Sequence, residues 1–115
     1  MFPGVTAVPS LGHTLGHTAY LIASGNDQLM IWGDTVHVTE VQPAFPEAGI
    51  AFDTDLAGAA SARKRIFDRV SADGVLIAGM HLHLPAFSRL RRRGDGYALH
   101  PEAWVHTLDA PPPVK

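Results

Sequence analysis

The sequence predicts an α/β layered fold, in which one mixed or antiparallel sheet is covered by a helix. Short apolar runs bounded by glycine or proline predict strands, and one longer stretch with a 3.6-residue apolar period predicts a helix. The order strand, hairpin, helix, strand, hairpin favours a layered arrangement. At 115 residues, with 46% hydrophobic and 17% charged residues, the chain suits one globular domain with a modest core.

The N-terminal part is predicted to contain a strand and a hairpin. Residues 5–8 alternate in polarity and end at a proline, which is typical of a short strand. Residues 18–24 and 28–32 are expected to pair around Gly25-Asn26-Asp27, a tight-turn signal. Because the run Leu-Met-Ile-Trp in the second arm is continuous, we expect it to be buried on both faces. Residues 36–42 are predicted to form a short extended piece.

A loop and the helix come next. Two prolines make residues 43–53 a loop, and Thr54 or Asp55 is expected to cap a helix that runs to about residue 72, where Asp73-Gly74 is expected to end it. Apolar residues of this stretch recur near the helical period, so one face should cover the sheet. The charged residues mostly fall elsewhere on the helix and are expected to face solvent: Arg63, Lys64, Arg65, Asp68 and Arg69.

The C-terminal part is predicted to contain a buried strand and a second hairpin. Residues 75–78 form the strand, and residues 89–92 and 97–99 form the hairpin around a turn at Gly94-Asp95-Gly96. We expect residues 1–109 to make up the domain. Residues 110–115 contain three consecutive prolines and are expected to be a poorly ordered tail.

Composition narrows the functional classes. The chain has no cysteine, so any metal must be held by histidine nitrogen and carboxylate oxygen, which suits zinc, iron, manganese or cobalt. A net charge of −2 predicts no nucleic-acid partner. No apolar run reaches the length of a membrane span, and the N-terminus does not resemble a signal peptide. We therefore expect no membrane contact and, by default, a cytoplasmic location.

Three residues are candidates for a metal site. His13, Asp34 and His81 each follow an apolar strand and lie next to, or shortly after, a glycine. Strand ends are where open sheets present ligand groups, and a carboxylate among imidazoles is a common set for a hydrolytic metal. The two oxygens of Asp34 could also bridge two ions. The alternative is that each residue merely caps a turn, and it stays open on these residues alone.

Longer motifs around these residues carry a resemblance. The pattern Gly-His-Thr-Leu-Gly-His-Thr, then Trp-Gly-Asp-Thr-Val-His, Phe-Asp-Thr-Asp and Gly-Met-His-Leu-His-Leu-Pro, resembles the C-terminal half of the metallo-β-lactamase fold. Within that fold it is similar to the branch of methyl parathion hydrolases and quorum-quenching lactonases. The resemblance runs from Phe2 to about Trp104.

The resemblance implies half of an αββα sandwich and a share of a dinuclear metal centre. By that resemblance His13 binds one metal, the catalytic Asp34 bridges both, and His81 binds the second. It also implies that a metal-bound hydroxide hydrolyses an ester, lactone or organophosphate substrate. Zinc is the expected metal. The family's His-x-His-x-Asp-His motif is absent from the sequence, so we expect at most one weakly held ion.

The remaining histidines have secondary expected roles. His17 is expected to support the site or simply to begin a strand. His37 could reach the metal or the substrate, or make a structural polar contact. His83 is two residues beyond His81, so an extended chain would point the two to opposite faces, and the resemblance favours His81. His100 and His106 are expected at the surface, and Trp32 and Trp104 in packing.

Three functions remain in competition. The first is a truncated metal-dependent hydrolase with little activity of its own. The second is a non-catalytic half that associates with a partner chain, or with its own copy, through an uncovered sheet face. The third is a small α/β domain whose histidines are unrelated to one another.

Overall fold

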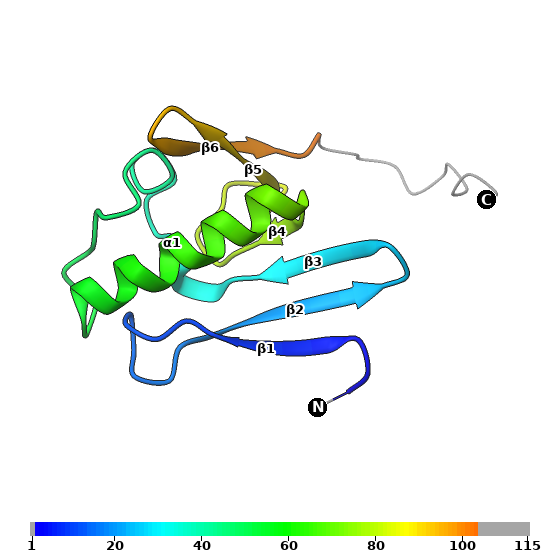
Figure 1. Cartoon of the computed structure of the whole chain (residues 1–115). Coiled ribbons are helices and arrows are strands. Elements are labelled where there is room, and N and C mark those ends of the chain that lie inside the picture. The colour runs from blue at the N-terminus through cyan, green and yellow to red at the C-terminus, as the bar shows by residue number, and fades with distance from the viewer. Residues whose placement is uncertain (1, 104–115) are drawn as a thin grey trace.

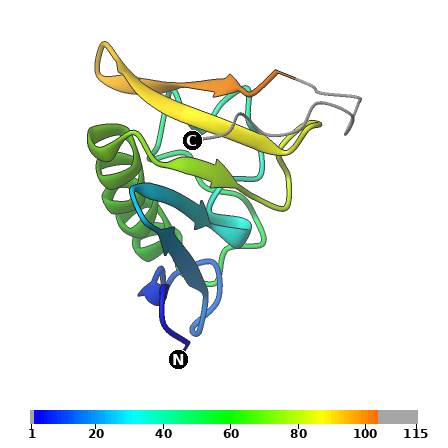
Figure 2. The ribbon, with the colours of Figure 1, turned by 90° about the vertical axis from the view of Figure 1, so that its right-hand side faces the viewer.

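A computed structural model describes residues 2–103 of the chain. Within this range a six-stranded sheet carries one α-helix on one face (Figures 1 and 2). The strands follow their sequence order across the sheet: β1 (Val5–Pro9), β2 (Thr18–Ser24), β3 (Asp27–Ile31), β4 (Leu76–Ala78), β5 (Phe87–Arg93) and β6 (Gly96–Pro101). The α/β layered prediction is confirmed. The expectations for Trp104, His106 and residues 110–115 lie outside the described residues.

The helix α1 (Leu56–Asp73) explains the one parallel pairing in the sheet. Neighbouring strands run antiparallel except β3 and β4, which α1 and the loop before it connect as a crossover. Asp55 caps the helix by accepting a hydrogen bond from the Gly58 backbone N–H at 3.0 Å. Gly74 ends it in a left-handed conformation with φ 62°. The predicted helix and its two end signals are confirmed.

The core lies between α1 and the sheet face that it covers. Paired residues Leu21, Met30 and Ile77 point toward the helix and are buried against Phe67 and Val70. The prediction that residues 28–32 are buried on both faces is wrong. In β3, buried Met30 is followed by Ile31, which is 38% exposed. Within residues 2–103, a helix covers only one face of the sheet, so β3 alternates.

Two further expectations are wrong. Residues 36–42 form a bend followed by a turn rather than an extended piece, because the side-chain oxygen of Gln42 accepts hydrogen bonds from the backbone N–H groups of His37 and Val38. Arg63 does not face solvent but is 1% exposed. The two predicted hairpins are confirmed, the second with slightly longer arms, and His100 is exposed as expected. No helix in the described residues is long and apolar enough to cross a membrane.

Candidate metal centre

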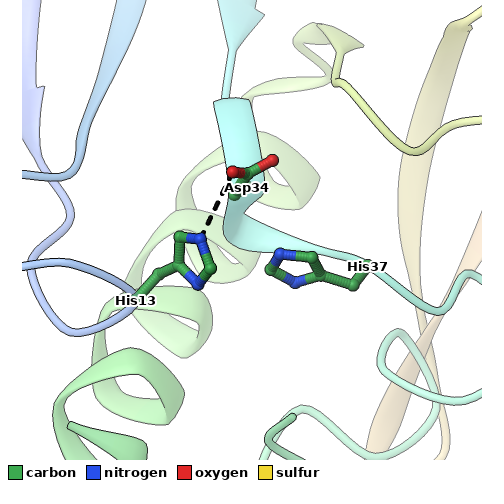
Figure 3. Close-up of side chains that lie close together, drawn as sticks. All are labelled: His13, Asp34 and His37. Carbon is green, nitrogen blue, oxygen red and sulfur yellow. Dashed lines mark ion pairs between the residues drawn. The ribbon is translucent and has the colours of Figure 1, made fainter. Parts of the chain in front are cut away.

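Three segments bring chemically reactive side chains together at one end of the sheet. His13 lies in the connection between β1 and β2, and Asp34 lies in a short 3-10 helix, η1 (Gly33–Thr35), directly after β3. His37 follows two residues after η1. Each of His13, Asp34 and His37 offers one ligand atom within 4.8 Å of the others, and Figure 3 shows the two imidazole rings on either side of the carboxylate.

Asp34 is the centre of the cluster. Its Oδ2 lies 3.3 Å from His13 Nε2, and its Oδ1 lies 3.0 Å from His81 Nε2. The structure thus brings the three residues expected at the site into contact, although they lie far apart in the sequence. Each carboxylate oxygen faces a different imidazole. His13 is the more enclosed partner, with a side chain 16% exposed, whereas His81 is 45% exposed.

His81 is placed by a close approach of backbone to side chain. It lies in the loop after β4, which starts at Gly79. A Cβ on Gly79 would lie 2.2 Å from Nε1 of the buried Trp32, so only glycine fits against that ring. His83 takes a different direction and pairs with exposed Glu40 at 2.9 Å. The structure therefore separates the two histidines and brings only His81 to Asp34.

His17 contacts the backbone of Asp34 rather than its carboxylate. Its Nε2 accepts a hydrogen bond from the Asp34 N–H at 2.9 Å, and its Nδ1 lies 2.7 Å from the hydroxyl oxygen of Ser10. Because Nε2 is an acceptor, the neutral ring is assigned its proton on Nδ1, and this N–H donates a hydrogen bond to Ser10. A Cβ on Gly33, whose φ is 56°, would lie 2.9 Å from this Nε2. His17 thus joins the turn of His13 to η1.

His37 packs between two other histidines. Its ring centroid is 4.7 Å from those of both His13 and His81. Its Nδ1 is buried and has no hydrogen-bond partner among the described residues. Burial lowers the pKa of His37, and the neighbouring His13 and His81 lower it further, against the opposing effect of Asp34. The neutral ring therefore keeps a lone pair available beside the Asp34 carboxylate.

Asp53 is a partner of His13 that the sequence pattern does not predict. Its buried carboxylate accepts a hydrogen bond from His13 Nδ1 at 2.9 Å and another from the Ile50 backbone N–H at 3.1 Å. Burial would raise the pKa of Asp53, but these hydrogen bonds and the charge of Arg63 outweigh it and lower the pKa. The backbone N–H of Thr54 also donates to the His13 carbonyl at 3.0 Å. The only sequence signal was the Phe-Asp-Thr-Asp motif, which does not indicate a contact with His13.

Solved structures match this fold. AidC, a dizinc quorum-quenching lactonase in complex with a product, superposes with a TM-score of 0.86 at 27% identity over 91% of this chain and 36% of its own. AbOPH, a hydrolase of the beta-lactamase superfamily, gives 0.84 at 28% identity, with 90% and 36% coverage. A probable metal-dependent hydrolase from Staphylococcus aureus gives 0.70 at 22% identity. Neither a protein-family model nor a curated protein matches the sequence.

This chain folds as part of a metallo-β-lactamase-fold domain. It spans about 36% of the length of AidC and AbOPH, and the resemblance noted in the sequence is confirmed at the level of the fold. Its solved neighbours are hydrolases, lactonases among them. AidC is a dizinc enzyme, so a divalent metal is the ion to test against the residues in this chain.

The chemistry of the donor set fits a divalent cation. When the Nδ1–H of His13 donates a hydrogen bond to Asp53, the neutral ring presents a lone pair on Nε2 toward the Asp34 carboxylate at 3.3 Å. Two acceptors that face each other repel unless a cation or a proton lies between them. His37 adds a third nitrogen or oxygen donor, because one of its ring nitrogens lies within 4.8 Å of the ligand atoms of the other two residues. Imidazole and carboxylate together suit zinc and related ions.

Proposed function

We propose that this chain supplies part of the divalent-metal site of a hydrolase that acts on a lactone, an ester or an organophosphate. The observation that carries the proposal is the position of the Asp34 carboxylate, with one oxygen facing His13 and the other facing His81. The solved structures of similar fold support the proposal, since they include lactonases with an acyl-homoserine product bound. This chain alone contributes too few ligands for two ions, so we expect at most one, weakly held.

Each residue has a separate role in this proposal. Asp53 accepts a hydrogen bond from the Nδ1–H of His13 and so directs the Nε2 lone pair toward Asp34. Asp34 turns one carboxylate oxygen toward His13 and the other toward His81. A carboxylate with its oxygens divided in this way could serve two metal positions. His37, held neutral, lies between the rings of His13 and His81 and can take a proton or orient a polar substrate atom. A bound divalent metal supplies Lewis-acid polarisation of the scissile group and an activated water.

Metal titration tests the proposal. We expect zinc or cobalt to raise the melting temperature of the chain, because a ligand that binds only the folded state stabilises it. The substitutions His13→Ala, Asp34→Asn and His81→Ala should each abolish this effect, whereas the exposed His100→Ala should leave it intact. Absence of any metal effect in the parent chain would instead support a small α/β domain with unrelated histidines. Elemental analysis that finds two tightly held ions, with turnover of a nitrophenyl ester, would contradict the claim that the chain is incomplete.

A second candidate function follows from the sheet face opposite α1. On this face, residues that are paired from strand to strand form two rows across the sheet. Both rows are apolar from β1 to β4, and one of them continues to Phe87 in β5. Tyr20, Ile31 and Phe87 are 41%, 38% and 41% exposed. An apolar face of this kind favours association. We propose that it binds a further β-sheet layer, supplied by a partner chain or by a second copy.

The oligomeric state tests this second candidate. In size-exclusion chromatography and sedimentation, the parent chain should elute as a dimer or larger species. Ile31→Lys should shift it toward the monomer, because a buried lysine would oppose the contact. Arg91→Lys, which keeps a charge elsewhere in the sheet, serves as the control. A clean monomer of the parent chain at high concentration would count against association.

A further inference from the structure

Arg63 is a buried cation that is not itself one of the candidate metal ligands. It lies on α1, is 1% exposed, and among the described residues makes no ion pair with a carboxylate. Its donors instead reach three backbone carbonyls. Nε donates to Thr35 at 2.8 Å, and Nη1 donates to Pro46 at 2.7 Å and to Ala48 at 3.1 Å.

These carbonyls belong to the two segments that carry the site. Thr35 directly follows Asp34 and lies two residues before His37. Pro46 and Ala48 lie in the loop that leads to Asp53, the hydrogen-bond partner of His13. A single guanidinium therefore spans the distance between the η1 turn and this loop.

The contact extends to His37 through a buried amide. The carbonyl of Ala48 also accepts a hydrogen bond from Gln42 Nε2 at 2.9 Å. The Gln42 Oε1 in turn accepts one from the His37 backbone N–H at 2.6 Å. Gln42 is 1% exposed, so this chain of hydrogen bonds is shielded from water. The position of His37 thus depends on the same loop that Arg63 holds.

The chemistry of arginine suits this task. A guanidinium is planar and presents its donors in a rigid fork, so it sets the spacing of the carbonyls it contacts. Burial lowers the pKa of Arg63, opposed by the negative charge of Asp53, and arginine stays protonated in proteins at neutral pH. An apolar side chain of similar volume would fill the same space without the cost of burying a charge. Arg63 therefore contributes geometry that packing alone would not supply.

We propose that Arg63 is a positioning residue of the metal centre, which holds the Asp34–His37 turn at a set distance from the His13–Asp53 pair. The role in metal binding rests on the proposed function above. The positioning itself does not, because the hydrogen bonds join the two segments whether or not a metal is bound.

Hydrogen exchange of the metal-free chain tests the positioning. In Arg63→Met, the backbone amides of His37 and Ile50 should exchange faster. Their acceptors are the side chains of Gln42, which is bonded to Ala48, and of Asp53, and both depend on the loop that Arg63 holds. Amides in the middle of α1 should stay protected. Val70→Ala is the matched control, because it removes buried packing from the same helix and touches no site residue. Arg65→Met, an exposed position on α1, is the second control.

Cobalt titration of the same variants tests the link to the site. Arg63→Met should weaken cobalt binding by about 10-fold or more and change the visible spectrum of the bound ion, as removal of residues behind metal ligands does. Both control variants should keep the parent affinity and spectrum. Arg63→Lys keeps the charge but loses the fork, so it should recover part of the protection and part of the affinity. If Arg63→Met does not fold, Arg63→Lys compared with Val70→Ala decides the matter alone.

The outcomes separate this inference from the proposed function. Unchanged exchange of the His37 and Ile50 amides in the Arg63 variants would overturn the positioning role. Equal effects in Val70→Ala would also overturn it, because they would reflect general loss of stability. If the parent chain binds no metal, the proposed function fails, and the exchange data still decide whether Arg63 holds the two segments together.

Discussion

The Nδ1 of His13 and the Oδ1 of Asp53 lie 2.9 Å apart, although the two residues are separated by most of the N-terminal half of the chain. The carboxylate is fully buried, and its second oxygen is occupied by the Ile50 N–H. The pair therefore sets both the orientation and the proton position of the His13 ring. Its Nε2 is left facing Asp34, where the proposed metal site would take a ligand.

We predict that Asp53→Asn weakens zinc or cobalt binding by about 10-fold to 100-fold, as loss of the carboxylate behind a metal-binding histidine does. An asparagine can still accept one hydrogen bond but cannot carry the charge that holds the His13 proton. Isothermal titration measures the change. Asp55→Ala is the control, because it removes the helix cap at a cost of about 1 kcal/mol and should not change metal affinity. Equal metal affinity in Asp53→Asn and the parent would contradict the prediction.

His17 should be replaceable by a residue that can accept the same hydrogen bond. We predict that His17→Ala destabilises the chain by about 1–3 kcal/mol, because the Asp34 N–H and Ser10 lose their partner. His17→Gln should recover part of this loss, since its amide offers both an acceptor and a donor. Urea unfolding gives the free energies. If glutamine is no better than alanine, the stability comes from ring packing rather than from the hydrogen bonds.

Acidification should destabilise the metal-free chain through His37. Burial, followed by the nearby His13 and His81, lowers the pKa of this ring. In the unfolded chain the histidine pKa has its ordinary value of about 6.5, so at mildly acidic pH the unfolded chain binds more protons than the folded chain. The stability that depends on a neutral His37 is present above that value and is lost as the pH falls through the lowered folded pKa.

The measurement compares the free energy of unfolding at about pH 7.5 and about pH 5. His37→Asn should lose less stability over this interval than the parent chain. The exposed His100→Asn should behave like the parent. An identical pH response in all three chains would show that His37 is not protonated less readily in the folded state.

Gly79 should not tolerate a side chain. A Cβ there would lie 2.2 Å from Nε1 of buried Trp32, so we predict that Gly79→Ala destabilises the chain by about 1–3 kcal/mol through overpacking. The displaced loop should also weaken metal binding through His81. Gly16→Ala is the control, because no atom lies within 4 Å of a Cβ at that position. Thermal unfolding of the two variants should therefore differ clearly.

Local sequence patterns determined the elements of this fold. The apolar period and the end signals Asp55 and Gly74 located α1, and short apolar runs between turns located the strands. The glycine-bounded turns also identified His13, Asp34 and His81 as neighbours at strand ends, because chain direction and strand order constrain where such ends meet. These signals are local, so they can be read from residues that are adjacent in the chain.

The tertiary structure decided which groups contact one another. Asp53 meets His13, and Arg63 is buried, because the loop before α1 folds back over the turn of His13 and offers its carbonyls to the helix. A helical pattern marks arginine as polar, but it cannot show that three backbone carbonyls lie within hydrogen-bond distance of the guanidinium. Likewise, only the path of the chain after β4 separates His81, which meets Asp34, from His83, which meets Glu40. Hydrophobic periodicity records which face is buried, whereas hydrogen-bond partners distant in sequence depend on the assembled fold.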